Sequence, residues 1–343
     1  MKRIASLVLV WSTCFAMGAA SAATFCVNTV NEISVALTQA ATNNEDDEIR
    51  IVAGTYSPPN GFAFSSDQTD SLSIRGGFNA NCTNLTGETT TLDGQDEVRP
   101  LFIYIPDGDF AVEDLTFVNG LSTNNRGGGL RVSSQTGDVR VDRNTFLANR
   151  ADDFGGALTA STASGSLLIR NNLAFANSSA NIGAFEFTQG GGEAYIVGNT
   201  IVANTSEGDF LAGGLHISGA ANFTLSNNII WNNVPEDAGP FMADFSSTAA
   251  SHTRIANDIG IVASGTVADL VVNELSVDPE FVPCGFLCVS YELERSSPLV
   301  DVGNDSPPGG MTLRDLAGKD RTIGAHVDIG AYENDLIFAD GFD

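Results

Sequence analysis

Residues 144–149 read Asn-Thr-Phe-Leu-Ala-Asn, and the same spacing of two asparagines recurs along the chain. The first members of successive pairs are 30, 28, 27 and 29 residues apart. A fixed period of this length is typical of a solenoid built from stacked coils. The pattern [Asn or Asp]-x4-Asn occurs at Asp114/Asn119, Asn144/Asn149, Asn172/Asn177, Asn199/Asn204 and Asn228/Asn233.

Each repeat also holds short runs of alternating apolar residues, which indicate strands with one buried face. A glycine-rich corner precedes one of these runs, and asparagine suits a corner because it tolerates a left-handed backbone and can hydrogen-bond along a ladder. We therefore predict an all-β fold, a right-handed parallel β-helix, over a β-sandwich, whose strands lack a fixed long period. The alternating pairs are Val139/Val141, Leu167/Ile169, Ala194/Ile196 and Phe223/Leu225.

The N-terminal end of the solenoid is expected to carry a short capping helix. Thr29 and Glu32 have the spacing of a capping box, and apolar residues follow at helical spacing. Such a helix would cover the open first coil and prevent edge pairing. We place the β-helix at residues 23–275, a C-terminal capping module at 276–334 and a short tail at 335–343.

Residues 1–22 have the pattern of a signal peptide: a basic start at Lys2 and Arg3, an apolar stretch, and the small residues Ala20-Ser21-Ala22. A retained N-terminal anchor is the alternative interpretation. The whole chain has a net charge of −26, which disfavours binding to nucleic acid or anionic membranes. We expect a secreted or cell-surface protein without a membrane-spanning segment after cleavage.

Four cysteines remain after residue 22, and an even number in an exported chain favours disulfides. They are Cys26, Cys82, Cys284 and Cys288. Three pairings are possible, and we favour Cys26–Cys82 with Cys284–Cys288 because each pair lies within one terminal region.

Two groups of residues are candidates for a site. The residues after the first inward position of the glycine-preceded strand are Arg131, Thr159, Glu186 and His216. If the register holds, they form an outward row in which Glu186 and His216 lie about 5 Å apart. This row is interpreted as a sugar-binding strip or an acid/base pair, and a solvated salt pair is the simpler alternative.

The second candidate is an acidic edge that follows the second asparagine of the repeat. Carboxylates converging there would raise one another's pKa or bind Ca²⁺, the one cofactor we consider. A hydrated acidic loop is the alternative. The metal candidates are Asp152, Glu207, Asp209 and Glu236, with Asp153 and Asp237 beside them.

From about Thr24 to Glu333 the chain resembles bacterial secreted right-handed β-helix repeat proteins, including polymorphic outer-membrane-protein-like members. Residues 278–333 resemble the C-terminal module that is labelled "choice-of-anchor". The segments that carry this second resemblance are Asp278-Pro-Glu-Phe281, Ser297-Pro-Leu-Val-Asp-Val-Gly303 and Val327-Asp-Ile-Gly-Ala-Tyr-Glu333. Residues 336–343 are similar to a short tail on other exported bacterial proteins, interpreted as a sorting tag or an unstructured end.

The resemblance does not supply an activity, because parallel β-helices include lyases, hydrolases and adhesins. The motifs of polygalacturonases, pectate lyases, Ser-His-Asp hydrolases and metal-His sites are missing from the sequence. We therefore expect a protein that binds glycans or surfaces without catalysis. The alternative is a polysaccharide lyase or glycoside hydrolase of the pectin lyase-like type that acts on an extended acidic polysaccharide.

Overall fold

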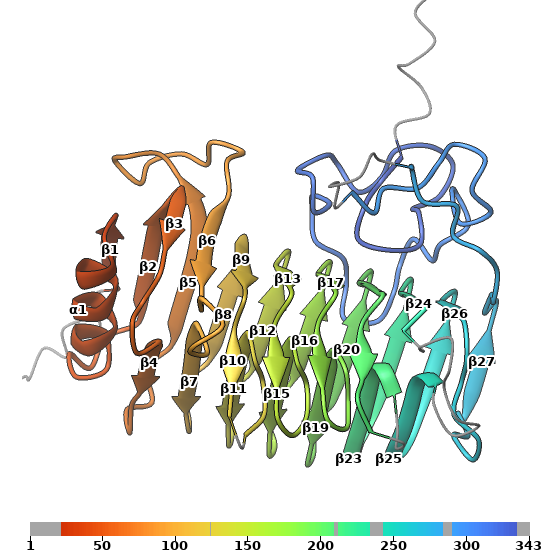
Figure 1. Ribbon diagram of the computed structural model, residues 1–343, viewed down its shortest axis with the longest axis horizontal. Coiled ribbons are helices and arrows are strands. Elements are labelled where there is room, and N and C mark those ends of the chain that lie inside the picture. Colours follow the sequence, from red (N-terminus) through yellow and green to blue (C-terminus); the bar gives the residue numbers. More distant parts are fainter. Residues whose placement is uncertain (1–21, 124, 209–211, 234–242, 284–289, 335–343) are drawn as a thin grey trace, which may run out of the picture.

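The protein is a parallel β-solenoid with one short helix, seen here in a computed structural model (Figure 1). The structure describes residues 22–123, 125–208, 212–233, 243–283 and 290–334. Every pairing between its named strands is parallel, and successive coils stack their strands into the same walls. The predicted right-handed parallel β-helix is therefore confirmed.

Three walls surround the core, and β23 and β25 run continuously from the first wall into the second. The first wall contains β4 (Phe62–Ser65), β7 (Leu101–Ile105), β11 (Leu130–Ser134), β15 (Leu158–Thr162), β19 (Phe185–Gln189), β23 (Ala212–Ser226) and β25 (Ala243–Ile255). The second contains β1 (Ala23–Val27), β2 (Asp47–Val52), β5 (Leu72–Phe78), β8 (Phe110–Glu113), β12 (Val139–Asp142), β16 (Leu167–Arg170), β20 (Glu193–Val197), the ends of β23 and β25, and β27 (Leu270–Val272).

The third wall is a sheet of eight short strands, and a fourth, smaller sheet follows it in each of four coils. The third wall contains β3 (Gly54–Tyr56), β6 (Thr90–Asp93), β9 (Leu115–Val118), β13 (Thr145–Leu147), β17 (Leu173–Phe175), β21 (Thr200–Val202), β24 (Ile229–Trp231) and β26 (Asp258–Ile259). The small sheet contains β10 (Leu121–Ser122), β14 (Arg150–Ala151), β18 (Ser178–Ser179) and β22 (Thr205–Ser206).

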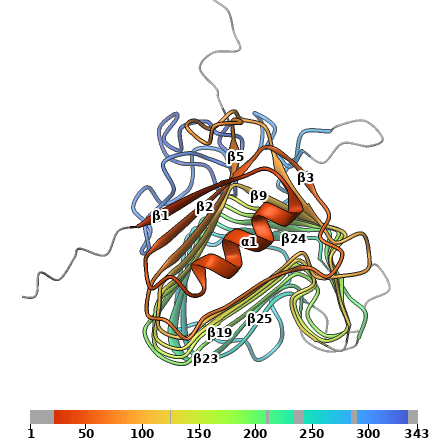
Figure 2. The ribbon, with the colours of Figure 1, turned by 90° about the vertical axis from the view of Figure 1, so that its left-hand side faces the viewer.

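The capping helix α1 (Val30–Ala40) covers the first coil, as the view along the solenoid shows (Figure 2). The Thr29 side chain accepts a hydrogen bond from the Glu32 backbone N–H, and Glu32 accepts one from the Asn28 N–H. Ile33 and Leu37 are buried against the core. The predicted helix and its Thr29 cap are confirmed, and Glu32 reaches back to the residue before the cap, one position earlier than in a standard capping box.

Two buried asparagine ladders fix the corners on either side of the third wall. In each step an asparagine oxygen accepts the backbone N–H of its counterpart one coil earlier, as Asn172 does from Asn144 at 2.9 Å. The Asn172 amide group donates to Val141 O and to Asn199 Oδ1. The ladders contain Asn144, Asn172, Asn199, Asn228 and Asn257 in one, and Asn149, Asn177, Asn204 and Asn233 in the other.

The first predicted pair, Asp114/Asn119, is out of register by one residue. Leu115 and Gly120 stand at the ladder positions, and their N–H groups donate to Asn144 and Asn149. Asp114 and Asn119 instead have positive φ angles of 58° and 49°. In every such corner the left-handed residue precedes the ladder position, so the ladder asparagines are selected for their hydrogen bonds and not for their backbone conformation.

Residues 276–283 and 290–334, part of the segment that we expected to cap the C-terminal end, lie instead against the outside of the third wall (Figure 1). Outward side chains of that wall, Phe175, Val202 and Trp231, pack against Leu293, Leu299 and Ile329 of this segment. Polar contacts add to the packing, since Asn171 donates to Ala331 O and Arg170 donates to Gly309 O. The segment covers one side of the solenoid.

Candidate functional site

The predicted row on the first wall is in register. Arg131 of β11 is the Cα partner of Thr159, Thr159 is the partner of Glu186, and Glu186 is the partner of His216. The next strand continues the row with Ser246. Period-2 alternation from the glycine-rich corner was therefore sufficient to align four strands.

The row is not solvated, contrary to the expectation of a surface salt pair. Glu186 is only 4% exposed and His216 only 5%. The Glu186 carboxylate accepts hydrogen bonds from Arg126 Nη1 at 2.6 Å and from Thr159 Oγ1 at 3.3 Å. Arg126 follows β10 and stacks 4.3 Å from the centroid of the Phe154 ring. Burial raises the pKa of Glu186, although the charge of Arg126 opposes this.

The His216 side chain contacts the next strand, β25, and not the strand of Glu186. Its Nδ1 lies 2.8 Å from Ser246 Oγ, and its Nε2 lies 3.3 Å from Thr248 Oγ1. Burial lowers the pKa of His216 to about 4, so the ring is neutral at pH 7. Within the described contacts Glu186 and His216 share neither a hydrogen bond nor an ion pair. The geometry therefore does not place them as an acid/base pair aimed at one substrate atom.

A second row of outward side chains on the same wall was not predicted from the sequence. Seven successive strands each place one hydroxyl group at the same outward position: Ser65, Tyr104, Ser133, Ser161, Thr188, Ser218 and Thr248. We call these residues the hydroxyl row. All seven side chains are exposed or half-buried. Neighbours touch, as Ser161 does with Ser133 at 3.1 Å and Thr188 with Ser218 at 2.9 Å. The row lies two residues beyond the predicted one on each strand, so the same register could have revealed it.

An aromatic and cationic patch lies at the N-terminal end of the hydroxyl row. Phe102 shares β7 with Tyr104, and the guanidinium groups of Arg99 and Arg131 each lie 5.8 Å from the Phe102 ring centroid. Burial and the nearby charge of Arg131 lower the pKa of Arg99 to about 10. Arg131 donates a hydrogen bond to the side chain of Asn125. Of Phe102, Arg99 and Arg131, only Arg131 was a candidate from the sequence.

The predicted acidic edge divides into ion pairs. Asp153 lies 3.5 Å from Arg126, and Glu207 lies 3.5 Å from Arg150. Asp152 is exposed at the surface. Asp209, Glu236 and Asp237 lie outside the described residues. Within the described part of the chain, no group of three or more His, Cys, Asp or Glu side chains is arranged to hold a metal ion. A shared Ca²⁺ site therefore has no support from Asp152 and Glu207.

The Cys26–Cys82 disulfide is present and links β1 to the segment after β5. This pairing agrees with the one favoured from the sequence. Cys284 and Cys288 lie outside the described residues.

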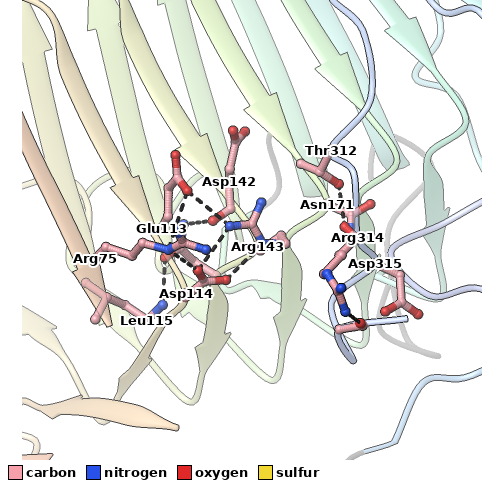
Figure 3. A network of polar contacts seen from close by, with 12 residues as sticks. Arg75, Glu113, Asp114, Leu115, Asp142, Arg143, Asn171, Thr312, Arg314 and Asp315 are labelled. Carbon is pink, nitrogen blue, oxygen red and sulfur yellow. Dashed lines mark hydrogen bonds and ion pairs between the residues drawn. The ribbon is translucent and has the colours of Figure 1, made fainter. Parts of the chain in front are cut away.

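A network of ion pairs on the outside of the second wall was also missed (Figure 3). Arg143 binds Asp114 at 2.9 Å and Glu113 at 3.0 Å, while Arg75 binds Asp114 at 2.7 Å. Arg140 pairs with both Glu113 and Asp142, and Asp142 pairs with Arg170, which also contacts the C-terminal segment. Because its charges are paired across neighbouring coils, we assign it to the stability of the wall and to the docking of that segment.

The profile of the family described as "Right handed beta helix region" matches residues 102–259. These residues include most of both rows on the first wall. No curated protein and no solved structure matches the chain. Among the described residues, there is no helix with the length and apolarity that crossing a membrane requires.

Proposed function

We propose that this chain is a secreted or cell-surface β-helix that binds an extended glycan along the hydroxyl row, without catalysis. The first wall is the binding face in this proposal. The ligand runs parallel to the solenoid axis and crosses successive strands, because the hydroxyl row has that direction.

The observation that carries the proposal is the unbroken series of seven outward hydroxyl groups. Each hydroxyl can donate one hydrogen bond and accept others, which matches the hydroxyl groups of a sugar chain. Strands repeat about every 4.8 Å, so the row extends over roughly 29 Å. Phe102 and Tyr104 add aromatic surface at one end, where flat apolar rings complement the polar row.

Secretion is supported by independent features of the sequence and the fold. Residues 1–22 have the composition of an export signal. The Cys26–Cys82 disulfide is typical of oxidising compartments outside the cytosol. Expression with residues 1–22 intact, followed by measurement of the N-terminus of protein recovered outside the cells, tests this part of the proposal.

The binding proposal is tested by screening the purified protein against neutral and uronate-containing polysaccharides, with and without Ca²⁺. Retention of at least one polysaccharide in affinity electrophoresis supports it. Retention that requires Ca²⁺ would assign a cation to the site. No retention of any polysaccharide class would contradict glycan binding.

A polysaccharide lyase or glycoside hydrolase is the second candidate, and the raised pKa of the buried Glu186 carboxyl favours it. A raised pKa is the direction of shift that a carboxyl acting as general acid needs. The same polysaccharides should then be cleaved, with new reducing ends or unsaturated products. Glu186→Gln would abolish that cleavage. A protein that only binds would release no product, either as the parent or as the Glu186→Gln variant.

A further inference from the structure

Arg99 and Arg131, which we call the arginine pair, have no carboxylate partner among the described residues. The chain has 16 Lys and Arg against 42 Asp and Glu, so acidic partners are plentiful. Arg126 on the same face shows the usual arrangement, because it pairs with Glu186 at 2.6 Å and with Asp153 at 3.5 Å. The arginine pair therefore carries positive charge that the described part of this acidic protein does not neutralise.

Hydrogen bonds to the segment before β11 hold the arginine pair in place. Arg99 Nε donates to Gly127 O and Arg99 Nη2 donates to Ser122 Oγ, both at 2.6 Å. Arg131 Nη1 donates to Asn125 Oδ1 at 2.7 Å. A long side chain that is fixed before a ligand arrives loses less conformational freedom on binding.

The arginine pair also keeps donors that no described residue uses. Arg99 Nη1, Arg131 Nε and Arg131 Nη2 form no hydrogen bond within the described part of the chain, and none of them is among its buried polar atoms without a partner. These nitrogen atoms therefore lie at the surface. A guanidinium group binds an oxyanion through a rigid fork of N–H groups, so the free donors suit a carboxylate or a sulfate.

Phe102 connects the arginine pair to the hydroxyl row, because both guanidinium groups lie 5.8 Å from its ring centroid. Phe102 is the Cα partner of Arg131, and two residues further along the same strands Tyr104 is the partner of Ser133. Side chains two residues apart point to the same face of a strand. A sugar residue that binds Tyr104 and Ser133 would therefore have the arginine pair at its side.

Positive charge beside the hydroxyl row is confined to this end. In the row of Arg131, the next three positions are closed, since Thr159, Glu186 and His216 are 6%, 4% and 5% exposed. Phe102 and Arg131 are half-buried. A ligand along the first wall would thus meet hydroxyl groups on successive strands, and charged donors at the strands β7 and β11.

We propose that the ligand of the hydroxyl row is an acidic glycan, with a carboxylate or sulfate group of one sugar residue bound by Arg99 and Arg131. This proposal rests on binding along the hydroxyl row and adds the charge of the ligand and the position of that charge. The net charge of −26 repels a polyanion, but salt at about 0.15 M limits the repulsion to about 8 Å. Contact at the arginine pair then decides, because charge-assisted hydrogen bonds are roughly twice as strong as neutral ones.

The affinity of the parent for two matched sets of polysaccharides tests the charge of the ligand. One set is polygalacturonate and its methyl ester, and the other is dextran sulfate and dextran, so the members of a set share a backbone and differ in charge. At least one acidic member should bind at least about tenfold more tightly than its neutral counterpart. The set that shows this preference distinguishes a carboxylate from a sulfate.

Arg131→Gln should lower the affinity for that acidic member at least about tenfold and leave the affinity for the neutral member as in the parent. The loss should shrink as NaCl rises from about 0.1 M to about 1 M, because the Debye length falls from about 10 Å to about 3 Å. Arg314→Gln is the matched control. Arg314 is exposed and donates to Gly318 O, but it belongs to the segment on the third wall.

Equal melting temperatures of the parent and the variants would show that the variants fold. Arg131→Thr is the second variant if Arg131→Gln does not fold, since the next strand has Thr159 at this position. A parent that binds none of the four polysaccharides, equal affinity for both members of each set, or an equal loss with Arg314→Gln would overturn the proposal. Ser133→Ala/Ser161→Ala would still weaken glycan binding if only the arginine assignment fails, but would bind like the parent if the hydroxyl row is not the site.

Discussion

Glu186 and His216 are direct partners on the adjacent strands β19 and β23, yet their side chains bind in opposite directions along the wall. Glu186 contacts Arg126 and Thr159, whereas His216 contacts Ser246 and Thr248. Both side chains are buried. Their proximity in register is therefore part of the structure of the wall, and the proposed ligand surface is the hydroxyl row beside them.

His216 should make the protein less stable in acid. Burial lowers its pKa from the ordinary histidine value of 6.5 to about 4 in the folded protein, so unfolding binds a proton between these values. Its stabilising contribution is lost as the pH falls from about 6.5 to about 4, by on the order of 2–3 kcal/mol. His216→Gln should flatten this part of the stability profile in denaturant titrations. The exposed His326 is the control, and if His326→Gln has the same effect, the assignment to His216 is wrong.

Glu333 should have the opposite pH dependence. Burial raises its pKa from 4.5 to about 8, although Arg321 opposes this. Between these values the unfolded chain releases a proton that the folded protein retains, so stability falls as the pH rises from about 4.5 to about 8. Each unit by which the pKa in the folded protein exceeds the pKa in the unfolded chain corresponds to about 1.4 kcal/mol of unfolding free energy. Glu333→Gln should remove this loss in melting experiments from pH 5 to pH 8, and an unchanged slope would contradict the assignment.

Asn172 should be essential to the corner ladder. It is fully buried, its oxygen accepts a bond from Asn144 N, and its amide group donates to Val141 O and to Asn199 Oδ1. Asn172→Leu removes these hydrogen bonds to two backbone groups and one side-chain oxygen, and each buried group left without a partner costs about 1–3 kcal/mol. Asn222→Leu is the matched control, because Asn222 is exposed on β23. Chemical denaturation should show a large loss for the first variant and a small change for the second; similar losses would argue against the ladder.

The four cysteines that follow residue 22 should all be oxidised. Cys26 and Cys82 are already paired, and the pairing of Cys284 with Cys288 stays a prediction. A thiol assay under denaturing, non-reducing conditions should therefore detect no free thiol. Two thiols would leave only the first disulfide in place, and four would contradict the paired state of Cys26 and Cys82.

Periodicity was sufficient to predict the solenoid, its capping helix and the register of Arg131, Thr159, Glu186 and His216. It was not sufficient to predict burial, because Arg126 and Phe154 come from irregular segments whose path no period specifies. The pair Asp114/Asn119 was misaligned because a left-handed corner residue and a ladder residue are adjacent and both accept Asn or Asp. The position of residues 276–334 depends on long-range packing against Phe175, Val202 and Trp231, and no sequence period indicates that these apolar side chains face outward.

Glycan binding by the hydroxyl row is tested most directly with two double variants, Ser133→Ala/Ser161→Ala and Thr116→Ala/Thr145→Ala. The measurement is the affinity of each variant and of the parent for a polysaccharide that the parent retains. Both pairs are half-buried neighbours on adjacent strands, but the second pair lies on the third wall. The first variant should lose at least about tenfold in affinity, or about 1.4 kcal/mol, whereas the second should bind like the parent. Equal affinity of the parent and both variants, or a loss confined to the third-wall variant, would contradict binding along the hydroxyl row.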